Sequence, residues 1–304
     1  MLLLCGLKRR VLRQYNSLCP NNRVFLNPLL LFLPYTVDLK IDTLITMAWQ
    51  QYDTLYSVGT NKPFKLSRSK IDLFIDCPRC FWLDRRLGIK RPDTPPFQIN
   101  KLIDELLKKE FDTYRSKKLP HPYMLEIGLK AVPFLHKDLD TWRHNFSGIQ
   151  YLHTDTNLLI FGAIDDIWEL EDGSLAIVDY KATAKNKEIT DLDPKGGWHD
   201  AYRRQMEIYQ WLFRMNGFSV SDKGYFVYAN GRMSEKDFNN TVKFTTHTFP
   251  YEGKTDWIEP TIIRIKEALE GDIPEVGAGP LGNGCTHCEY AKKRTEMTLR
   301  ALKK

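Results

Sequence analysis

The sequence predicts an α/β fold in which a central mixed β-sheet is flanked by helices. Segments with helical periodicity alternate along the chain with strand-like segments, which is the pattern of α/β domains. The segment Ser174–Lys181 contains an apolar run, as expected for a strand that is buried on both faces. The composition, with 42% hydrophobic and 27% charged residues, is that of an ordinary globular protein.

Two helices are predicted in the N-terminal half of this domain. The first lies within Lys65–Gly88, because Ile71, Phe74 and Ile75 fall on one face of it. A proline-rich loop separates it from the second helix, which runs from about Gln98 to Lys117. The apolar stripe expected on this second helix consists of four side chains, Leu102, Leu106, Leu107 and Phe111.

A β-rich block follows the second helix. Ser147–Thr154 and Leu158–Glu169 alternate on either side of a turn at Asp155–Asn157, so they predict two strands. A second turn, at Glu171–Gly173, leads into the buried strand Ser174–Lys181. The remaining elements are a helix from about His199 to Met215, strands at Lys223–Tyr228 and Val242–Phe249, and a helix at Thr255–Glu270.

The first 46 residues differ from the rest, with six basic and only two acidic side chains. Residues 24–37 are apolar, but they are too short for a membrane span and are interrupted by Pro28 and Pro34, so no membrane partner is expected. We expect residues 1–46, with Cys5 and Cys19, to be an over-extended start or a targeting or disordered segment. Residues 47–304 then form one domain, with its core at about residues 64–295.

The net charge of +6 gives only weak support for nucleic-acid binding, because the first 46 residues contribute +4 of it. Any basic patch must therefore be local. Four basic clusters could contact phosphates: Arg85-Arg86, Lys90-Arg91, Arg203-Arg204 and Lys292-Lys293-Arg294. The sequence has no glycine-rich phosphate loop of the ATPase type, so any helicase would be a separate partner chain.

Three charged residues stand out by their position at the ends of neighbouring strands. Asp165 lies near the end of one predicted strand, and Asp179 and Lys181 end the next. Residues two apart in a strand point to the same face, so Asp179 and Lys181 project together, beside Asp165 if the two strands pair. The same alternation places Asp166 on the opposite face.

These residue types suit the hydrolysis of a phosphodiester. A hard cation such as Mg²⁺ or Mn²⁺ takes oxygen ligands, here the Asp165 and Asp179 carboxylates and the Tyr180 carbonyl. Such an ion lowers the pKa of a bound water, while Lys181 would position that water or offset developing negative charge. The alternative is an ordinary salt bridge at a strand end.

Three short motifs follow one another along the chain: Gly162-Ala-Ile-Asp165, Asp179-Tyr-Lys181 and Gln205-Met-Glu-Ile-Tyr209. Their order resembles the RecB-like branch of the PD-(D/E)XK nuclease superfamily, and is similar to CRISPR-associated spacer-acquisition exonucleases and AddB-type nuclease domains. The resemblance implies a restriction-endonuclease-like core and a metal-dependent, exonuclease-like deoxyribonuclease in DNA repair, recombination or defence. In that branch the Gln and Tyr of the third motif line the active site and contact DNA.

The resemblance extends upstream to Cys77-Pro78, which matches the end of the family's opening helix. Where the family often has a metal-binding His on its next helix, this chain has Asp104, which could supply a further oxygen ligand. The implied partners are single-stranded DNA or DNA with free ends, together with a helicase or repair protein. The alternative is a catalytically weak or inactive DNA-binding module.

Four cysteines form two Cys-x-x-Cys pairs, Cys77/Cys80 and Cys285/Cys288. This spacing indicates a metal or cluster site in a reducing compartment such as the cytoplasm, rather than a disulfide framework. Four thiolates suit a 4Fe–4S cluster or a tetrahedral Zn²⁺. The resemblance favours the cluster, with zinc as the alternative, although Arg294 stands where the family has its last cysteine. Either centre would be a staple joining the two ends of the domain.

Overall fold

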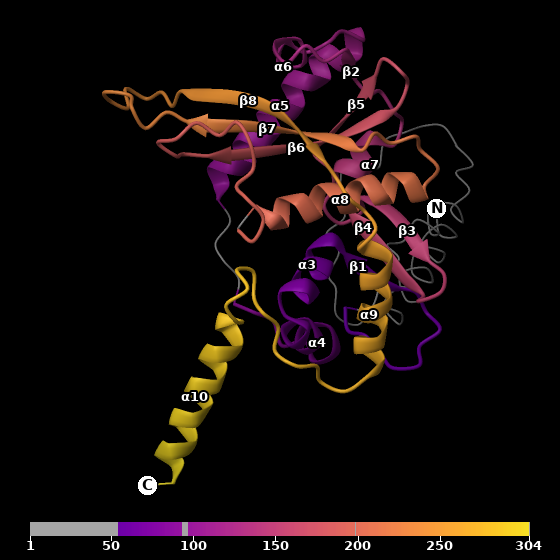
Figure 1. The fold of residues 1–304 in the computed structure, drawn as a ribbon, viewed down its shortest axis with the longest axis vertical. Helices are drawn as coiled ribbons and strands as arrows, with labels where there is room; N and C mark the ends of the chain where they lie inside the picture. Colours follow the sequence, from indigo (N-terminus) through magenta and orange to yellow (C-terminus); the bar gives the residue numbers. More distant parts are fainter. Residues whose placement is uncertain (1–53, 93–96, 198, 304) are drawn as a thin grey trace, which may run out of the picture. The chain divides into compact units, whose positions relative to one another are not determined.

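Two mixed β-sheets form the framework of the computed structural model, which describes residues 54–92, 97–197 and 199–303 (Figure 1). The expected boundary at Met47, with Cys5 and Cys19, lies outside these residues. The larger sheet has the order β2-β5-β6-β7-β8, with β2 (Ala131–Pro133), β5 (Asp166–Leu170), β6 (Leu175–Thr183), β7 (Lys223–Gly231) and β8 (Phe244–Glu252). The smaller sheet has the order β1-β4-β3, with β1 (Phe64–Ser67), β4 (Leu158–Gly162) and β3 (Ile149–His153).

Both sheets combine parallel and antiparallel pairs, which confirms the predicted α/β fold. In the larger sheet β6 pairs in parallel with β7 and antiparallel with β5. In the smaller sheet β4 pairs in parallel with β1 and antiparallel with β3. The single strand expected at Leu158–Glu169 is wrong. It is two strands in different sheets, because the chain crosses from one sheet to the other between Gly162 and Asp166.

Helices cover both faces of the larger sheet. Figure 1 shows α5 and α8 on opposite sides of it. Among the described residues, no helix is both long and apolar enough to span a bilayer. The helices are α3 (Arg68–Asp76), α4 (Pro78–Leu87), α5 (Gln98–Lys117), α6 (Pro122–Glu126), α7 (Leu139–Arg143), α8 (Asp200–Met215), α9 (Ile258–Glu270) and α10 (Thr286–Leu302).

Strand β6 is buried on both faces, as its apolar run predicts. Leu175 and Ile177 belong to the hydrophobic core on the side of α8, whereas Ala176 and Val178 belong to the core on the side of α5. The alternation continues, so that Asp179 lies on the same face as Ile177. The charged end of β6 therefore begins where the core beneath α8 ends.

The helix expected within Lys65–Gly88 is broken in two. Cys77 is extended (φ −160°, ψ 103°), and Pro78 opens α4 at its first turn. The residue before a proline is driven out of the helical region, and proline itself is favoured at the first helical position, so this break follows from the Cys-Pro dipeptide. The break turns Cys77 inward, and its side chain is fully buried.

The apolar stripe predicted on α5 is only half correct. Leu107 and Phe111 are buried, but Leu102 and Leu106 are each 52% exposed. The buried side of the helix is the one that carries Phe111, because the Phe111 ring stacks on Trp168 of β5 with ring centroids 5.6 Å apart. A helix has room for one such row against the sheet, so the adjacent leucine row faces outward.

Candidate active site and metal centre

Asp165 lies in the link that carries the chain from β4 to β5. Its Oδ2 accepts a hydrogen bond of 2.9 Å from the backbone N–H of Tyr180 in β6. The neighbouring Asp166 pairs with Val178 in the antiparallel ladder and points to the other face of the sheet, where it is fully buried. The structure thus places Asp165 beside the charged end of β6, although it is not the strand residue that the sequence predicts.

Asp179 and Lys181 project together from β6. The Asp179 carboxylate is fully buried and forms an ion pair with the Lys181 ammonium. Burial raises the pKa of Asp179 to about 7, against the opposing effect of Lys181. Burial also works against the charge on Lys181, but the carboxylates of Asp179 and Asp165 outweigh it and raise the pKa of Lys181. The pair is therefore a proton-sensitive carboxylate held next to a firmly charged cation.

Asp104 of α5 faces the same region. Lys108, one turn further along the helix, binds Asp104 Oδ2 at 2.7 Å and lies 3.9 Å from Asp165 Oδ1. Burial and the charge of Asp165 raise the pKa of Asp104. The Lys108 ammonium thus lies between two carboxylates, a position that also suits a metal ion.

The carboxylates keep oxygen atoms that could accept a metal. Apart from the ion pair with Lys181, neither oxygen of Asp179 has a hydrogen-bond partner within the described part of the chain, and nor does Asp104 Oδ1, although all three atoms are buried. Unsatisfied buried oxygens are costly unless a cation completes them. Among the described residues, the three aspartates do not converge as tightly as the four cysteines described below.

A small pocket of about 100 Å³ opens beside these residues. Asn100, Asp104, Lys181 and Tyr202 are among the side chains that line it. The Lys181 ammonium lies 4.5 Å from the centre of the Tyr202 ring, in a cation–π contact that fixes its direction. The pocket therefore presents the candidate site to solvent.

Gln205 and Tyr209 approach this site from α8. Lys181 Nζ lies 3.4 Å from Gln205 Oε1, and Gln205 Nε2 lies 3.4 Å from the Tyr209 hydroxyl. Tyr209 is buried, and burial raises the pKa of its hydroxyl. Gln205 of the third motif thus contacts Lys181 of the second motif, at a distance near the upper limit for a hydrogen bond.

Gly162 leaves the space that the Tyr209 ring occupies. A Cβ atom built on Gly162 would lie 2.5 Å from Tyr209 Cε1, far inside van der Waals contact. The first and third motifs are therefore matched in shape, since the ring packs directly on the bare backbone of the glycine.

We expect Gly162→Ala to lower the DNA cleavage that the sequence resemblance implies by roughly ten- to a hundredfold, because displacing Tyr209 by about 1 Å disturbs the site that it lines. Single-turnover kinetics with labelled DNA would measure the loss, and circular dichroism would check that the fold persists. Gly197→Ala is the matched control, since the nearest atom to its added Cβ is 3.7 Å away. An unchanged rate in Gly162→Ala would contradict this role of the ring.

Arg68 is a site residue that the sequence did not reveal. It stands at the start of α3, and its Cβ lies 3.5 Å from a Cβ built on Gly162. Burial opposes its charge, but Tyr209, Asp72 and Asp179 outweigh burial and raise the pKa of Arg68. Arg68 therefore adds a second cation near Asp179. Its place, directly after β1, carries no sequence pattern that would mark it as a site residue.

Behind the site, Asp166 anchors a buried ionic network. Arg115 and Arg143 both bind Asp166 Oδ1, the latter at 3.0 Å, and the Tyr180 hydroxyl donates to Oδ2 at 2.7 Å. Arg143 also donates to the backbone carbonyl of Asp165 at 3.0 Å. The network holds the backbone of Asp165 and the side chain of Tyr180 from the face opposite the candidate site.

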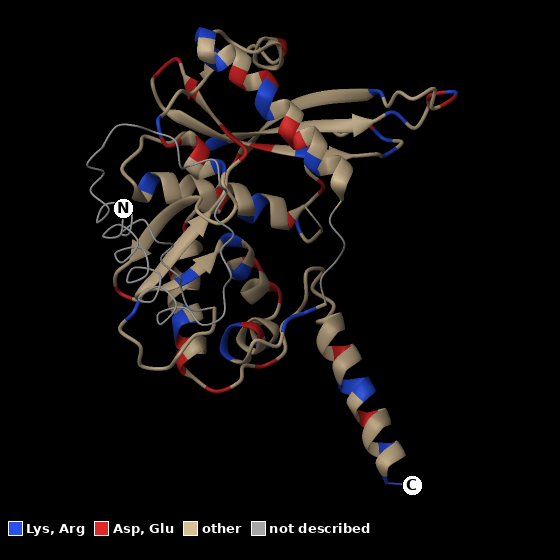
Figure 2. Ribbon diagram, turned by 180° about the vertical axis from the view of Figure 1, so that it is seen from behind, with Lys and Arg blue, Asp and Glu red and all other residues tan. Residues whose placement is uncertain are grey.

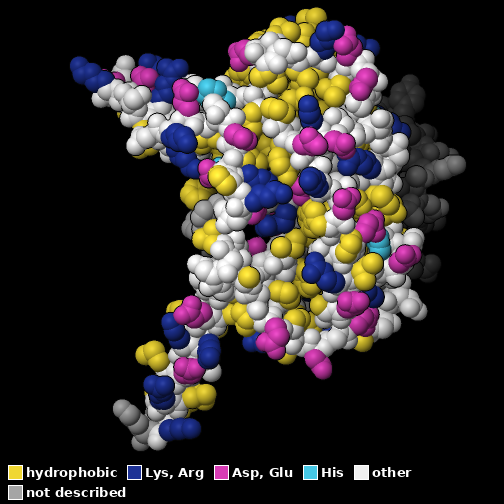
Figure 3. Space-filling view, in the orientation of Figure 1, with side chains coloured by type: hydrophobic (Ala, Val, Ile, Leu, Met, Phe, Trp, Pro, Cys, Tyr) yellow, Lys and Arg dark blue, Asp and Glu magenta, His cyan; other side chains and the backbone are white. Residues whose placement is uncertain are grey.

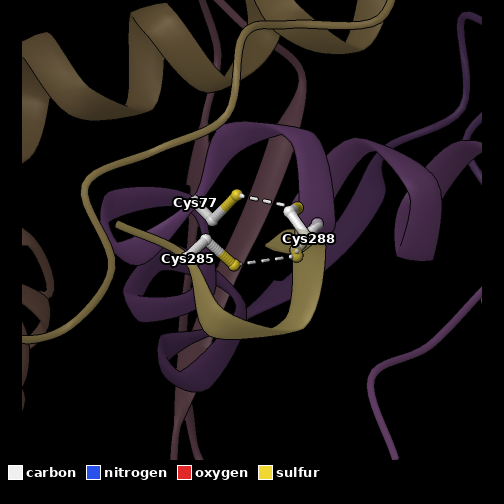
Figure 4. Close-up of side chains that lie close together, drawn as sticks. Cys77, Cys285 and Cys288 are labelled. Carbon is white, nitrogen blue, oxygen red and sulfur yellow. Dashed lines mark hydrogen bonds between the residues drawn. The ribbon is translucent and has the colours of Figure 1, made fainter. Parts of the chain in front are cut away.

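The four cysteines of the two pairs come together in one cluster. Figure 4 shows three of them, Cys77, Cys285 and Cys288, side by side. The four sulfur atoms all lie within 4.8 Å of one another, with Cys80 3.5 Å from Cys288 and 3.6 Å from Cys285. Cys77 and Cys80 flank the start of α4, and Cys285 and Cys288 flank the start of α10. This four-cysteine group joins the two ends of the domain, as predicted, and could hold a metal ion or cluster.

The surroundings of the cluster favour thiolates that share a cation. The N–H of Gly277 donates to Cys77 Sγ at 3.3 Å, and Arg91 donates to Cys285 Sγ at 3.5 Å. Burial acts against the Cys77 thiolate, but the Gly277 N–H and the neighbouring cysteines lower its pKa to about 7. Burial raises the pKa of Cys80 to about 11. A bound metal would displace the remaining protons.

Several predicted phosphate contacts are already engaged in ion pairs. Arg204 binds Asp72 and lies 3.5 Å from Asp76, while Arg203 binds Asp200 at 2.7 Å. Figure 2 shows how closely basic and acidic residues alternate along the helices. These two arginines therefore position α8, and their charges are largely neutralised within the fold.

Comparison with known proteins identifies the class of this one. A sequence model of the PD-(D/E)XK nuclease superfamily matches residues 65–292. The chain belongs to the PD-(D/E)XK nuclease superfamily, and the resemblance inferred from the three motifs is confirmed.

Two curated relatives come from Clostridium botulinum strains Hall and Langeland, and each is one subunit of an ATP-dependent helicase/nuclease. Each is 27% identical over 169 residues, which cover 48% of this chain and 12% of the relative. The chain thus spans about an eighth of the length of these relatives.

Two solved structures are distantly similar. SSO0001 has 15% identity and a TM-score of 0.31, and the match covers 70% of this chain and 77% of SSO0001. A protein of Eubacterium rectale assigned as an exonuclease has 13% identity and a TM-score of 0.34. This match covers 74% of this chain and 87% of the E. rectale protein.

Proposed function

We propose that this protein is a Mg²⁺- or Mn²⁺-dependent nuclease that hydrolyses DNA phosphodiester bonds. The observation that carries the proposal is the fully buried carboxylate of Asp179, held beside Lys181 and Asp165 at the end of β6. A buried carboxylate that lies next to a second carboxylate and a fixed cation, and whose oxygens can still accept a ligand, suits metal-assisted phosphoryl chemistry. Membership of the superfamily supports the same conclusion.

Each residue has a distinct proposed role. Asp165, Asp179 and the Tyr180 carbonyl would hold the ion, with Asp104 as a further oxygen ligand. When bound, the ion supplies a water of lowered pKa and polarises the phosphate. Lys181 orients the attacking water or offsets the charge that develops on the phosphate. Gln205 and Tyr209 would contact the DNA strand and hold it in the active site.

The biological setting is also part of the proposal. The curated relatives are helicase/nuclease subunits, and the order of the three motifs resembles that of a branch with exonucleases among its members. We therefore propose exonuclease-like action in DNA repair, recombination or defence, on single strands or free ends, beside a separate helicase or repair protein. Reduced cysteines suit a cytoplasmic location.

The decisive assay incubates the purified protein with end-labelled single- and double-stranded DNA, in Mg²⁺, in Mn²⁺ and in EDTA. Metal-dependent cleavage is the expected result, and the ladder of products distinguishes removal of terminal nucleotides from internal cuts. DNA binding in EDTA without cleavage in either metal would instead favour the catalytically inactive binding module.

Binding of the catalytic ion should tighten as the pH rises through about 7. The pKa of Asp179 is raised to about 7, so below that pH a proton competes with the ion for the carboxylate. We expect the apparent affinity for Mn²⁺ to fall by about tenfold per pH unit below about 7 and to level off above it. Calorimetric titration across this range measures the effect, and Asp179→Asn should abolish it. A flat affinity would remove Asp179 from the ligand set.

We propose a single zinc ion for the cysteine centre, although the family resemblance predicts a 4Fe–4S cluster. Four sulfurs around one tetrahedral ion with bonds of about 2.3 Å lie about 3.8 Å apart. The sulfur atoms of Cys77 and Cys288 are 3.8 Å apart, Cys80 lies 3.6 Å from Cys285 and 3.5 Å from Cys288, and all four sulfurs lie within 4.8 Å of one another. A cluster binds each thiolate to a different iron, and so holds the sulfurs further apart. Elemental analysis and visible absorption distinguish one zinc per chain from four irons.

A further inference from the structure

We propose that the groove between residues 89–92 and α10 binds the unpaired bases and phosphates of a single-stranded nucleic acid. This inference rests on the proposed nuclease function, because it gives the substrate a second binding surface on the same domain. The groove has a volume of about 560 Å³ and lies outside the candidate active site, next to the cysteine centre.

The floor of the groove is apolar, and its edges are basic. Leu83, Ile89 and Leu299 contribute apolar surface, while Lys90 and Arg294 contribute charge. No carboxylate is among the side chains that line the groove, in the part of the chain that the structure describes. Stacking surfaces with a cationic border are what single-strand binding sites combine.

The face of α10 that borders the groove is distinct from its other faces. The lining residues recur every three or four positions: His287, Tyr290, Ala291, Arg294, Thr295, Thr298 and Leu299. The acidic residues of the helix, Glu289 and Glu296, lie off this face, and Glu289 pairs with Lys293 at 2.6 Å. Figure 3 shows charged and apolar side chains mixed along the outside of this helix. One face of α10 thus combines an aromatic ring with positive charge and no negative charge.

Tyr290 is the residue best placed to stack on a base. Its side chain is 69% exposed although it lines the groove, so one face of its ring is open to a ligand. A base of any identity can stack on such a ring, because every base has a flat π-face.

The charges of Lys90 and Arg294 are available to phosphates. Among the described residues, neither side chain forms an ion pair, whereas Arg91 is held by Asp76 at 3.8 Å and by Cys285. Asp76 also contacts Arg204, the neighbour of Gln205 on α8. These contacts connect Arg91, which lines the groove, to the helix that carries the third motif.

Two other occupants fit less well. A DNA duplex hides its bases and offers phosphates only, so it leaves the apolar floor uncovered. An acidic peptide would match Lys90 and Arg294, but it gains nothing specific from the open ring of Tyr290. Both are outcomes that the experiment separates.

The test measures binding by fluorescence anisotropy, with a labelled oligo-dT strand, the matching duplex and a glutamate-rich peptide. The full chain carries Asp179→Ala throughout, so that a bound strand stays whole. We expect Tyr290→Ala to weaken oligo-dT binding by about tenfold. Tyr290→Phe keeps the aromatic ring and should bind oligo-dT as tightly as the chain with Tyr290. We expect Lys90→Glu with Arg294→Glu to reduce the salt dependence of binding by about 1.4 in log–log slope, for two lost phosphate contacts.

Matched controls identify a general effect of surface charge or aromatic loss. Lys130→Glu with Lys223→Glu reverses two exposed lysines elsewhere, and Phe146→Ala removes a ring that is 77% exposed. The proposal is overturned if the groove variants bind oligo-dT normally, if the controls lose as much affinity, or if only duplex or peptide binding depends on Tyr290. If the chain with Asp179 intact cleaves DNA and the groove variants bind the strand normally, this inference alone is overturned. If strand binding depends on Tyr290 and the chain with Asp179 intact does not cleave, the proposed function alone is overturned.

Discussion

Replacing Asp179 with asparagine is expected to slow DNA cleavage by at least roughly a thousandfold while leaving the fold intact. The substitution keeps the shape of the side chain but removes the negative charge that would bind the ion. Asp179 is fully buried and paired with Lys181, so removing its charge leaves Lys181 without its buried partner and lowers the stability as well. Single-turnover cleavage and thermal unfolding of the same preparation measure the two effects separately.

Glu207→Gln provides the matched control for that loss. Glu207, like Asp179, is a buried carboxylate, but it lies on α8. It accepts hydrogen bonds from the Trp257 indole at 2.7 Å and from the Lys254 N–H at 3.1 Å, away from the candidate site. We expect this variant to lose stability and keep its cleavage rate. If Asp179→Asn still cleaves at the wild-type rate, Asp179 has no place in the chemistry and the proposed site is wrong.

Removing one sulfur from the cysteine centre is expected to have the largest effect on stability. Cys285→Ala should abolish metal binding at the cysteine centre and lower the melting temperature by roughly 10 °C or more. The reason is that the free energy of binding a structural metal is largely folding free energy. Helix α10 has no buried residues of its own, so without the centre it has little else to hold it. Metal content and calorimetric unfolding test the prediction.

His287→Ala is the control for the cysteine variant. His287 lies between Cys285 and Cys288, is exposed, and does not belong to the group of converging ligands. We expect its metal content and melting temperature to match those of the wild type. If Cys285→Ala melts like the wild type, the centre is not a structural staple, whatever metal it holds.

Much of the fold could be predicted because its longer elements carry strong periodic signals. Helix α5 matches its predicted bounds, and α8 begins one residue later than expected. The break after Gly162 could not be predicted, because strand alternation continues through it. At this point the Tyr209 ring packs on Gly162 and the chain passes to the other sheet, and both features depend on contacts distant in sequence. The short elements α6 and α7 were missed because they contain too few residues to show a period.

Strand geometry alone predicts only the part of the candidate site whose residues share one strand. Asp179 and Lys181 lie two apart in β6, so their common face follows from strand geometry. Arg68 and Lys108 come from other elements and reach the site through packing, so spacing alone gives no sign of them. The side of α5 that faces the sheet was likewise decided by the stacking of Phe111 on Trp168.

The position of the cysteine centre also has a consequence for how the protein matures. Cys80 and Cys285 are separated by 205 positions, so the first pair of thiols leaves the ribosome long before the second. During synthesis the two early cysteines have no partners, and the metal can close the domain only when translation has passed Cys288. Closing so long a loop is entropically costly, so we expect metal capture to be a late event that follows formation of the sheets. A shortage of the metal would then leave a folded core with an unfastened end, which cellular proteases would recognise and trim.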